Sequence, residues 1–365
     1  MTDVPSRADG LHVTTSHDEA APSVQPRAFE PNRDAHDRAA GNALHVPVLV
    51  HTCIEFLEPA LGGDEPILID ATVGMGGHAQ ALLERFPRLT VVGIDRDPQA
   101  IELASQRLRR FGKRFEPVLA TYDRIDSIAS SLGRSGRVDA VLMDLGVSSL
   151  QLDDEGRGFS YSHDAPLDMR MDASSGRSAA DLLATEGVDE IARVLREFGD
   201  EKFASRIARR IVDVRGATPI TRTGQLAQIV REAIPAPARR TGGNPSKRTF
   251  QALRIAINDE LAVLQRAVPR AIATLRVGGR IVVESYQSLE DRIVKREFAK
   301  GATSSTPAGL PLELEGHEPY LRLLTRGALK ADARERGANP RSSSVRLRAA
   351  ERIRHTHATT QRDKS

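Results

Sequence analysis

The segment Asp70-Ala71-Thr72-Val73-Gly74-Met75-Gly76-Gly77-His78 has the composition of a turn that holds a ligand against main-chain atoms. Glycines let the backbone approach a ligand closely, and the N-terminus of a following helix offers free N–H groups. Asp95 comes about 20 residues later, where an acidic side chain at the tip of the next strand can accept hydrogen bonds from both hydroxyls of a ribose. These residues predict a site for a nucleoside cofactor. Because Gly74-x-Gly76-x-x-Ala79 also satisfies the dinucleotide fingerprint, the pattern alone leaves the identity of the cofactor open.

A second group of chemical interest follows the apolar run Val138 to Met143 and begins with Asp144. In a doubly wound sheet this run is expected beside the first strand, at the switch point where ligands bind. A carboxylate there would face the reactive end of the cofactor. The alternative is that Asp144 only caps the segment that follows.

Two further segments have the composition of substrate contacts. Residues 157–172 mix aromatic, basic and acidic side chains with more apolar residues than a solvated surface needs, which favours a loop that faces the substrate. Lys247 and Arg248 stand at the start of an apolar helical pattern. They are candidates for phosphate contacts, or else belong to a solvated helix start.

These residues must be positioned by a sheet in which strands alternate with helices. Apolar runs predict strands near 67–69, 91–94, 116–119, 138–143, 278–283, 321–324 and 345–347. Helices are expected at 78–85, from Asp97 with Pro98 in its first position, from Asp200, and over 250–275 with a kink at Pro269. Ser288 and Asp291 resemble a capping box that opens another helix. The predicted fold class is therefore α/β: a parallel, doubly wound sheet interrupted by a helical domain.

The order of these patterns divides the chain into parts. Residues 1–43 lack any apolar period and are predicted to be a disordered tail, and residues 353–365 a flexible one. The sheet domain is expected over 44–149 and 246–352, with a helical domain inserted at 150–245.

Composition excludes several classes of protein. None of the apolar runs in the 365 residues reaches the length of a membrane helix, and the polar N-terminus lacks a signal-peptide core, so the protein is expected in the cytoplasm. The single cysteine, Cys53, cannot form an intramolecular disulfide or a zinc-thiolate site, and we expect it to be a buried thiol and the protein to have no metal site. A net charge of +3 is a weak indication of a polyanionic partner.

The segments above closely resemble the bacterial small-subunit ribosomal RNA cytosine-N4 methyltransferases, the RsmH or MraW family. The resemblance runs from about His45 to Arg352. It is carried by exact runs in the same order: Gly76-Gly77-His78, Ile94-Asp95-Arg96-Asp97-Pro98-Gln99-Ala100, Asp144-Leu145-Gly146-Val147-Ser148-Ser149, Pro166-Leu167-Asp168-Met169-Arg170-Met171-Asp172, Arg248-Thr249-Phe250-Gln251-Ala252 and Ser288-Leu289-Glu290-Asp291-Arg292-Ile293-Val294-Lys295.

This resemblance implies a Rossmann-like class I methyltransferase sheet with an inserted helical substrate domain. It implies that S-adenosylmethionine is bound through Gly76, Gly77, His78, Asp95, Tyr122, Asp144 and Gln151. The implied substrate is a decoding-centre cytidine of 16S ribosomal RNA, presented in the assembled small ribosomal subunit.

Two positions depart from the pattern of many family members. Tyr122 stands where they often have Phe, and its ring can still cover an adenine. Ser285-Tyr286-Gln287 stands where they often have Ser-Phe-His, so a proton-transfer role of that His does not carry over.

Transfer of a methyl group to the exocyclic amine of cytosine requires close positioning, because the amine lone pair is delocalised into the ring. Acceptors for the amine hydrogens would stabilise the developing positive charge, and Asp144 is the candidate catalytic residue. Three other readings stay open: a nicotinamide-dependent oxidoreductase, a DNA amine methyltransferase and a non-catalytic RNA-binding assembly factor. The second commonly carries an Asp-Pro-Pro-Tyr motif where this chain has Asp144-Leu145-Gly146-Val147.

Overall fold

A computed structural model of the protein describes residues 1, 47–147, 155–239, 244–307, 309–310 and 312–355. The chain divides into two units, Met1–Leu44 and His45–Ser365, and the fold described here is that of the second. The predicted N-terminal tail, apart from Met1, and most of the predicted C-terminal tail lie outside the described residues. Within those residues, no helix combines the length and the apolar character that crossing a membrane would need.

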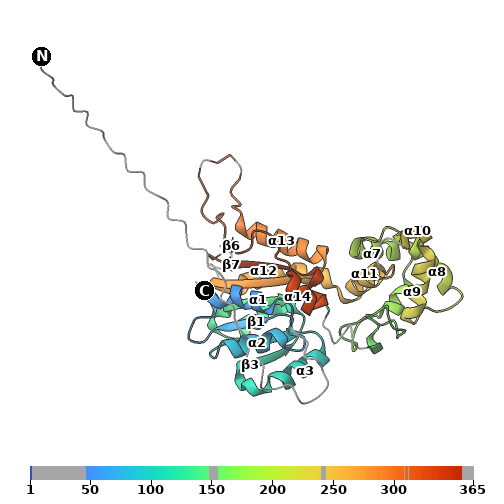
Figure 1. The fold of residues 1–365 in the computed structure, drawn as a ribbon, viewed down its shortest axis with the longest axis horizontal. Coiled ribbons are helices and arrows are strands. Elements are labelled where there is room, and N and C mark those ends of the chain that lie inside the picture. Colours follow the sequence, from blue (N-terminus) through green and yellow to red (C-terminus); the bar gives the residue numbers. More distant parts are fainter. Residues whose placement is uncertain (2–46, 148–154, 240–243, 308, 311, 356–365) are drawn as a thin grey trace. The chain divides into compact units, whose positions relative to one another are not determined.

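In the described part of the chain, seven strands form one sheet in the order β3-β2-β1-β4-β5-β7-β6 (Figure 1). Their bounds are β1 Ile67–Asp70, β2 Thr90–Asp95, β3 Phe115–Leu119, β4 Val138–Asp144, β5 Leu275–Ser285, β6 Leu321–Leu323 and β7 Arg346–Arg352. Strands β1 to β5 pair in parallel, whereas β7 is antiparallel to both β5 and β6. The strand order reverses between β1 and β4, which is where such sheets form their ligand crevice.

The pairing of β1 with β4 brings the predicted site residues to one edge. Ile69 pairs with Val141 and Asp70 with Leu142, so β4 continues two residues beyond the end of β1, to Asp144. Strand β4 is buried from Val138 to Met143, because helices cover both faces of a parallel sheet. Asp70, Asp95 and Asp144 therefore all stand at the carboxyl edge, as the sequence predicts.

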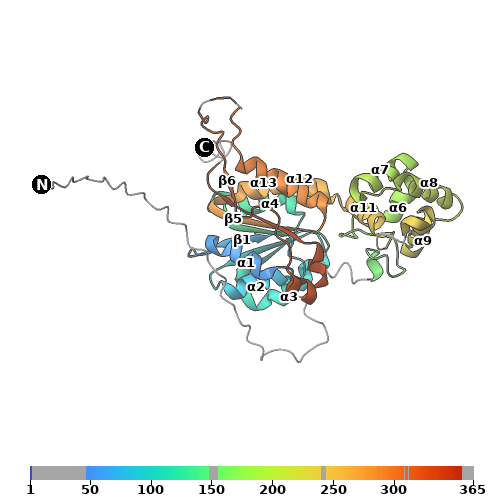
Figure 2. The ribbon, with the colours of Figure 1, turned by 45° about the horizontal axis from the view of Figure 1, so that its top comes forward.

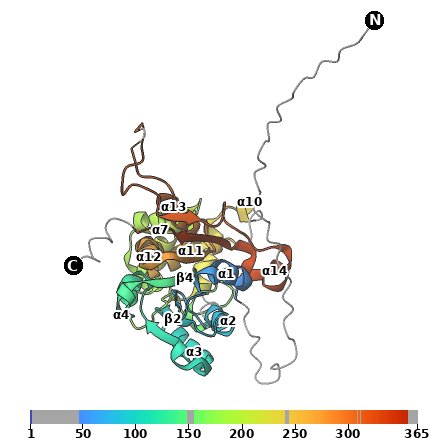
Figure 3. The same cartoon turned by 90° about the vertical axis from the view of Figure 1, so that its left-hand side faces the viewer.

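Helices cover the two faces of this sheet. On one face α4 (Ile125–Ser131), α12 (Glu260–Thr274) and α13 (Ser288–Ala302) pack on Ile69, Val141 and other buried residues of the central strands. On the other face α1 (Val50–Leu57), α2 (Gly77–Arg85) and α3 (Pro98–Leu108) pack on Leu68 and Leu142. Figures 2 and 3 show α12 and α13 together on the side of the sheet opposite α2 and α3.

Six of the helices that follow β4 have a hydrophobic core of their own, which includes Leu182, Leu195, Ile207, Leu226 and Phe250. These helices are α6 Ala179–Thr185, α7 Val188–Gly199, α8 Ala204–Arg215, α9 Thr223–Ala233, α10 Ala236–Arg239 and α11 Lys247–Asn258, and α14 (Ala333–Ala338) follows near the end of the chain. The predicted fold class, a Rossmann-like α/β sheet with a helical insertion, is confirmed.

The single long helix expected over 250–275 is wrong. The helical run breaks at Asp259, between α11 and α12, whereas Pro269 lies inside α12. Asp259 has a left-handed backbone with φ of 51°. Beside it, the buried amide of Asn258 accepts from the Met171 N–H (2.8 Å) and donates to the Met169 carbonyl (2.8 Å). These long-range hydrogen bonds stabilise the chain at the break between the two helices. No local sequence pattern predicts them.

One predicted helix start and one predicted capping pair are also wrong. Helix α8 begins at Ala204 rather than Asp200, which ends α7 in a left-handed conformation. Helix α13 begins at Ser288, but its capping box joins Gln287 and Glu290 instead of Ser288 and Asp291. Asp291 instead accepts hydrogen bonds from Arg346 and Arg348 of β7. The predicted cap of α3 is confirmed, because the Asp97 side chain accepts from the Gln99 N–H.

Candidate active site

A cavity of about 540 Å³ lies at the carboxyl edge of the sheet. Five of the predicted site residues line it: Gly77, His78, Asp95, Tyr122 and Asp144. Gly76 is the residue that caps α2 immediately before them. Gln151 lies outside the described residues.

The glycine turn owes its course to backbone conformations that other residues rarely adopt. Gly74 and Gly76 have φ of 50° and 78°, in the left-handed region. At Gly77 there is no room for a side chain, since a Cβ atom would come within 2.6 Å of the Pro47 ring. The turn thereby brings main-chain atoms to the cavity wall.

Asp95 holds the ends of two loops beside this turn. One carboxylate oxygen accepts from the Gly74 N–H (3.0 Å) and the other from the Asp97 N–H (2.9 Å). Burial raises the pKa of Asp95 to about 6, although these two hydrogen bonds oppose the rise. Each oxygen keeps a lone pair that a ligand hydroxyl could use.

The far side of the cavity is aromatic and basic. Phe159, Tyr161 and Met171, from the segment predicted to face the substrate, line it, and Lys247 and Arg254 of α11 join them. Other members of that segment make internal contacts instead: Arg157 donates to Asp97 (2.5 Å) and Arg170 to Asp168 (2.7 Å). Some residues of the segment thus face the cavity, and others make hydrogen bonds that hold the segment in place.

Asp144 is held at the end of β4 by contacts from distant parts of the chain. Its N–H donates to the Thr72 hydroxyl (2.6 Å), and its Oδ1 accepts from the Tyr286 hydroxyl (2.8 Å). Its Oδ2 lies 3.7 Å from Nδ1 of His78. Tyr286 was noted in the sequence only as a departure from the family pattern, and its contact with Asp144 was not predicted.

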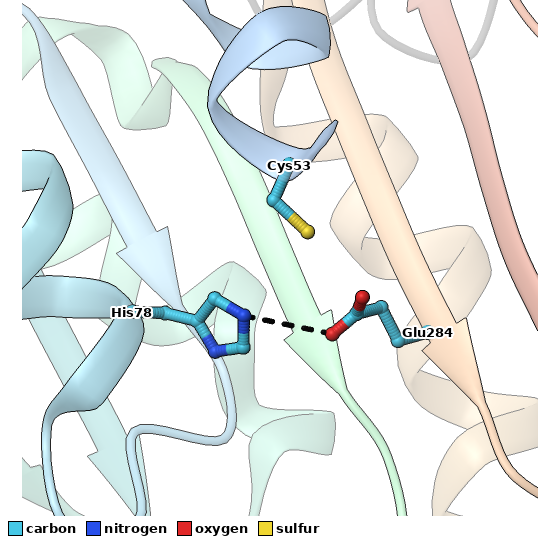
Figure 4. Close-up of side chains that lie close together, drawn as sticks. All are labelled: Cys53, His78 and Glu284. Carbon is cyan, nitrogen blue, oxygen red and sulfur yellow. Dashed lines mark ion pairs between the residues drawn. The ribbon is translucent and has the colours of Figure 1, made fainter. Parts of the chain in front are cut away.

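His78 lies between Asp144 and a second carboxyl group, Glu284 of β5. Its Nε2 is 3.0 Å from the Val48 carbonyl oxygen and 3.6 Å from a Glu284 carboxyl oxygen (Figure 4). Glu284 is fully buried, and its carboxyl group interacts with the Cys53 thiol and with the carboxyl group of Asp144. Burial, together with the charge of Asp144, raises the pKa of Glu284 well above its ordinary value.

Cys53 completes this buried group and is a free, buried thiol, as predicted. Although the sequence predicts no metal site, Cys53, His78 and Glu284 each offer a possible ligand atom, all within 4.8 Å of one another (Figure 4). A metal ion on Nε2 would require His78 to give up its contact with Val48. Burial raises the pKa of the thiol well above its ordinary value, so the group favours the protonated form of cysteine.

Comparison with known proteins adds to this geometry. Residues 42–353 match the MraW methylase family. The ribosomal RNA small subunit methyltransferase H of Beutenbergia cavernae is 61% identical over 318 residues, which are 87% of this chain and 95% of that protein. The protein of that name from Saccharopolyspora erythraea is 55% identical over 327 residues, 90% of this chain and 99% of its own.

Similarity to solved structures is lower. The structure of an rRNA methylase from Streptococcus thermophilus covers 85% of this chain and 99% of its own, with 13% identity and a TM-score of 0.37.

Proposed function

The chain belongs to the MraW methylase family, as its motifs predict, and we propose that it transfers a methyl group from S-adenosylmethionine to the N4 amine of a decoding-centre cytidine in 16S ribosomal RNA. The acceptor is presented in the assembled small ribosomal subunit, which places the reaction in the cytoplasm. Relatives named ribosomal RNA small subunit methyltransferase H support the RNA substrate. The observation that carries the proposal is the cavity that gathers the glycine turn, Asp95 and Asp144.

The residues of this cavity fit S-adenosylmethionine. Its volume of about 540 Å³ lies in the range of small-molecule and cofactor sites. Asp95 supplies acceptors for ribose hydroxyls, Tyr122 an apolar ring for the adenine, and the turn at Gly76, Gly77 and His78 main-chain atoms. Gln151 joins this set by the family resemblance. When bound, the cofactor supplies an electrophilic methyl group on a positively charged sulfur.

The chain's own contribution to the reaction is position and charge. The amine of cytosine is a weak nucleophile, so holding it at the methyl group removes much of the barrier. Asp144, partly exposed in the cavity, accepts a hydrogen bond from the amine and stabilises the positive charge that develops on nitrogen.

Helices α6 to α10 hold the RNA. We assign residues 150–245 to this substrate-binding domain and 44–149 with 246–352 to the methyltransferase domain. Helix α11 packs in the helical core and also lines the cavity, so it couples the two. Its exposed Lys247 stands where an RNA phosphate can approach.

Methylation of isolated small subunits tests the proposal. Purified protein and labelled S-adenosylmethionine are added to subunits from a strain that lacks this modification, and the nucleosides are identified by mass spectrometry. We expect label in N4-methylated cytidine. Double-stranded DNA and protein-free 16S RNA are parallel acceptors. Label in DNA alone, or on a cytosine ring carbon, would overturn the assignment.

A further inference from the structure

The two residues that follow Asp95 connect the end of β2 to the substrate side of the cavity. Nη1 of Arg96 donates to the main-chain carbonyl of Asn258 (2.7 Å), at the break between α11 and α12. Oδ2 of Asp97 accepts from Nη1 of Arg157 (2.5 Å), in the segment predicted to face the substrate. The strand end that carries the proposed ribose acceptor is therefore tied to the chain both before and after helices α6 to α10.

The guanidinium of Arg157 extends this connection to the cavity wall. Its Nη2 donates to the main-chain carbonyls of Met171 (2.5 Å) and Arg170 (3.3 Å). It also lies 5.8 Å from the centre of the Phe159 ring. Met171 and Phe159 both line the cavity, and the Met171 N–H is held by the amide of Asn258. One side chain thus joins the cofactor side of the cavity to its substrate side.

Burial and geometry make this joint a firm one. The side chains of Asp97 and Arg157 are only 2% and 13% exposed, so water and salt screen their ion pair weakly. A planar guanidinium presents its donors in a fixed fork, which lets one group serve a carboxylate and a carbonyl together. Arg170 of the same segment differs, because its donors go to Asp168 (2.7 Å) and to the Gly176 carbonyl (3.2 Å), which are also part of the substrate side.

We propose that Arg157 is a positioning residue that couples the cofactor site to the acceptor site, so that a bound cofactor strengthens the binding of the small-subunit RNA. This inference rests on the function proposed above. Asp95 holds the Asp97 N–H (2.9 Å), and ribose hydroxyls on the same carboxylate restrain this strand end further. Arg157 transmits the restraint to Met171 and Phe159. The RNA then meets a wall that is already ordered and loses less conformational entropy on binding.

Affinity for small subunits, with and without a cofactor analogue, tests the coupling. Unmodified subunits are titrated in a filter-binding assay, either alone or with saturating S-adenosylhomocysteine, which has no methyl group to transfer. Couplings between sites are commonly about 5–150-fold, and we expect the wild type to bind at least about fivefold more tightly with the analogue. Because coupling is reciprocal, subunits should raise the affinity for the analogue by the same factor. Equal affinities with and without the analogue would overturn the proposal.

Arg157→Lys assigns the coupling to this side chain. Lysine keeps a positive charge beside Asp97, but its single nitrogen cannot span the carboxylate and the Met171 carbonyl as the guanidinium does. In R157K the coupling factor should fall below about twofold, with little change in affinity for subunits alone. The transfer rate at saturating subunits should also change little, because Arg157 does not line the cavity. A melting curve checks that the variant is folded, and a wild-type coupling factor in R157K would remove Arg157 from the connection.

Arg170→Lys is the matched control, since it makes the same chemical change in the same segment. Its contacts leave β2 untouched, so R170K should keep the wild-type coupling factor whatever its affinity for subunits. Loss of coupling in R170K as large as in R157K would mean that only the general order of the segment matters, and would overturn the role of Arg157.

The binding assay also separates this inference from the function on which it rests. A wild-type protein that methylates subunits, but binds them equally well with and without the analogue, refutes only the coupling. A protein that binds subunits and transfers no methyl group to them refutes the proposed function.

Discussion

Four carboxyl groups stand near the ends of β1, β2, β4 and β5, and they differ in their partners: two accept hydrogen bonds from main-chain N–H groups, and two contact other side chains. Asp70 and Asp95, on β1 and β2, accept from main-chain N–H groups two residues further on, at Thr72 (3.3 Å) and Asp97 (2.9 Å). On β4 and β5, Asp144 contacts the Tyr286 hydroxyl, and Glu284 lies beside His78. The first pair shapes the backbone, and the second pair forms part of a network of side chains.

This difference separates positioning from chemistry within one cavity. A carboxylate that holds a turn must remain where it is, and its free lone pairs are suited to a ligand that is bound but not changed. A carboxylate whose partners are a hydroxyl, an imidazole and another carboxyl group can exchange protons with them. We therefore expect substitutions near β1 and β2 to affect stability and cofactor affinity, and those near β4 and β5 to affect the rate.

The largest effect is expected for Asp144→Asn. Asparagine keeps the shape and can still accept from Tyr286, but it removes the charge beside the reacting amine. The single-turnover rate at saturating S-adenosylmethionine should fall by roughly 100-fold or more, the scale of losing one electrostatic contact in a closed site. Asp64→Asn, at a carboxylate whose side chain is 97% exposed, is the control. A wild-type rate in D144N would make Asp144 a binding or structural residue.

For the carboxyl groups of β1 and β2, the expected effect is on the stability of the fold, and Asp70→Asn tests it. Burial raises the pKa of Asp70 from 3.8 to about 7, so the folded protein holds a proton that the unfolded chain has lost between those values. Stability contributed by this group therefore falls as pH rises through that window and stays low above it. Asp70→Asn removes this pH-dependent loss of stability. Between pH 5 and pH 8 the free energy of unfolding of the variant should therefore rise by about 2–3 kcal/mol relative to that of the wild type, at about 1.4 kcal/mol per pKa unit.

Urea unfolding of both proteins at the two pH values measures this difference. Equal pH dependence in the two proteins would show that Asp70 is ionised in the folded state across the range.

A smaller effect is expected for Asp95→Ala, which removes the proposed ribose acceptor. Losing hydrogen bonds to a charged acceptor costs on the order of 1.5–3 kcal/mol, so affinity for S-adenosylmethionine should fall about tenfold or more. Calorimetry with the cofactor and with NAD checks both the loss and the choice of ligand. Because Asp95 also holds Gly74, a melting curve must show that the variant is folded. Wild-type affinity in a folded D95A would remove Asp95 from the cofactor site.

The same contrast explains what could be predicted from the sequence. The glycine turn, the Asp97 cap and the run that ends at Asp144 are local patterns, and each stands where it was expected. The switch point followed because parallel strands buried on both faces leave apolar runs in the sequence. These features need only neighbouring residues and the general rules of α/β sheets.

The residues that were missed depend on contacts between distant segments. Tyr286 lies 142 residues from Asp144, and the amide of Asn258 bonds to Met171, 87 residues away. Residue types at these positions carry no local signal, so neither the contact between Tyr286 and Asp144 nor the break between α11 and α12 could be predicted from the sequence. Glu284 directly follows the apolar run Ile281 to Val283, and a carboxyl group at the end of such a run was the one available sign.

The smallest expected effect concerns the RNA contacts of α11 and α8. These helices carry four cations whose place in the sequence makes them candidates for phosphate contacts: Arg206, Arg210, Lys247 and Arg248. Arg210 pairs with Glu232 (3.0 Å) and Arg248 donates to the Asp200 carbonyl (3.2 Å), whereas Lys247 is exposed and lines the cavity. A cation already paired releases fewer counterions on binding, so Lys247 should contribute more than Arg210 to the salt dependence of RNA binding. In Lys247→Gln the slope of log affinity against log salt should fall by about 0.7–0.9, and in Arg210→Gln by less.

Lys113→Gln, at an exposed position between α3 and β3, is the control for net charge. Equal slopes in K247Q and K113Q would mean that the RNA responds to the overall charge of the protein and that Lys247 makes no phosphate contact of its own.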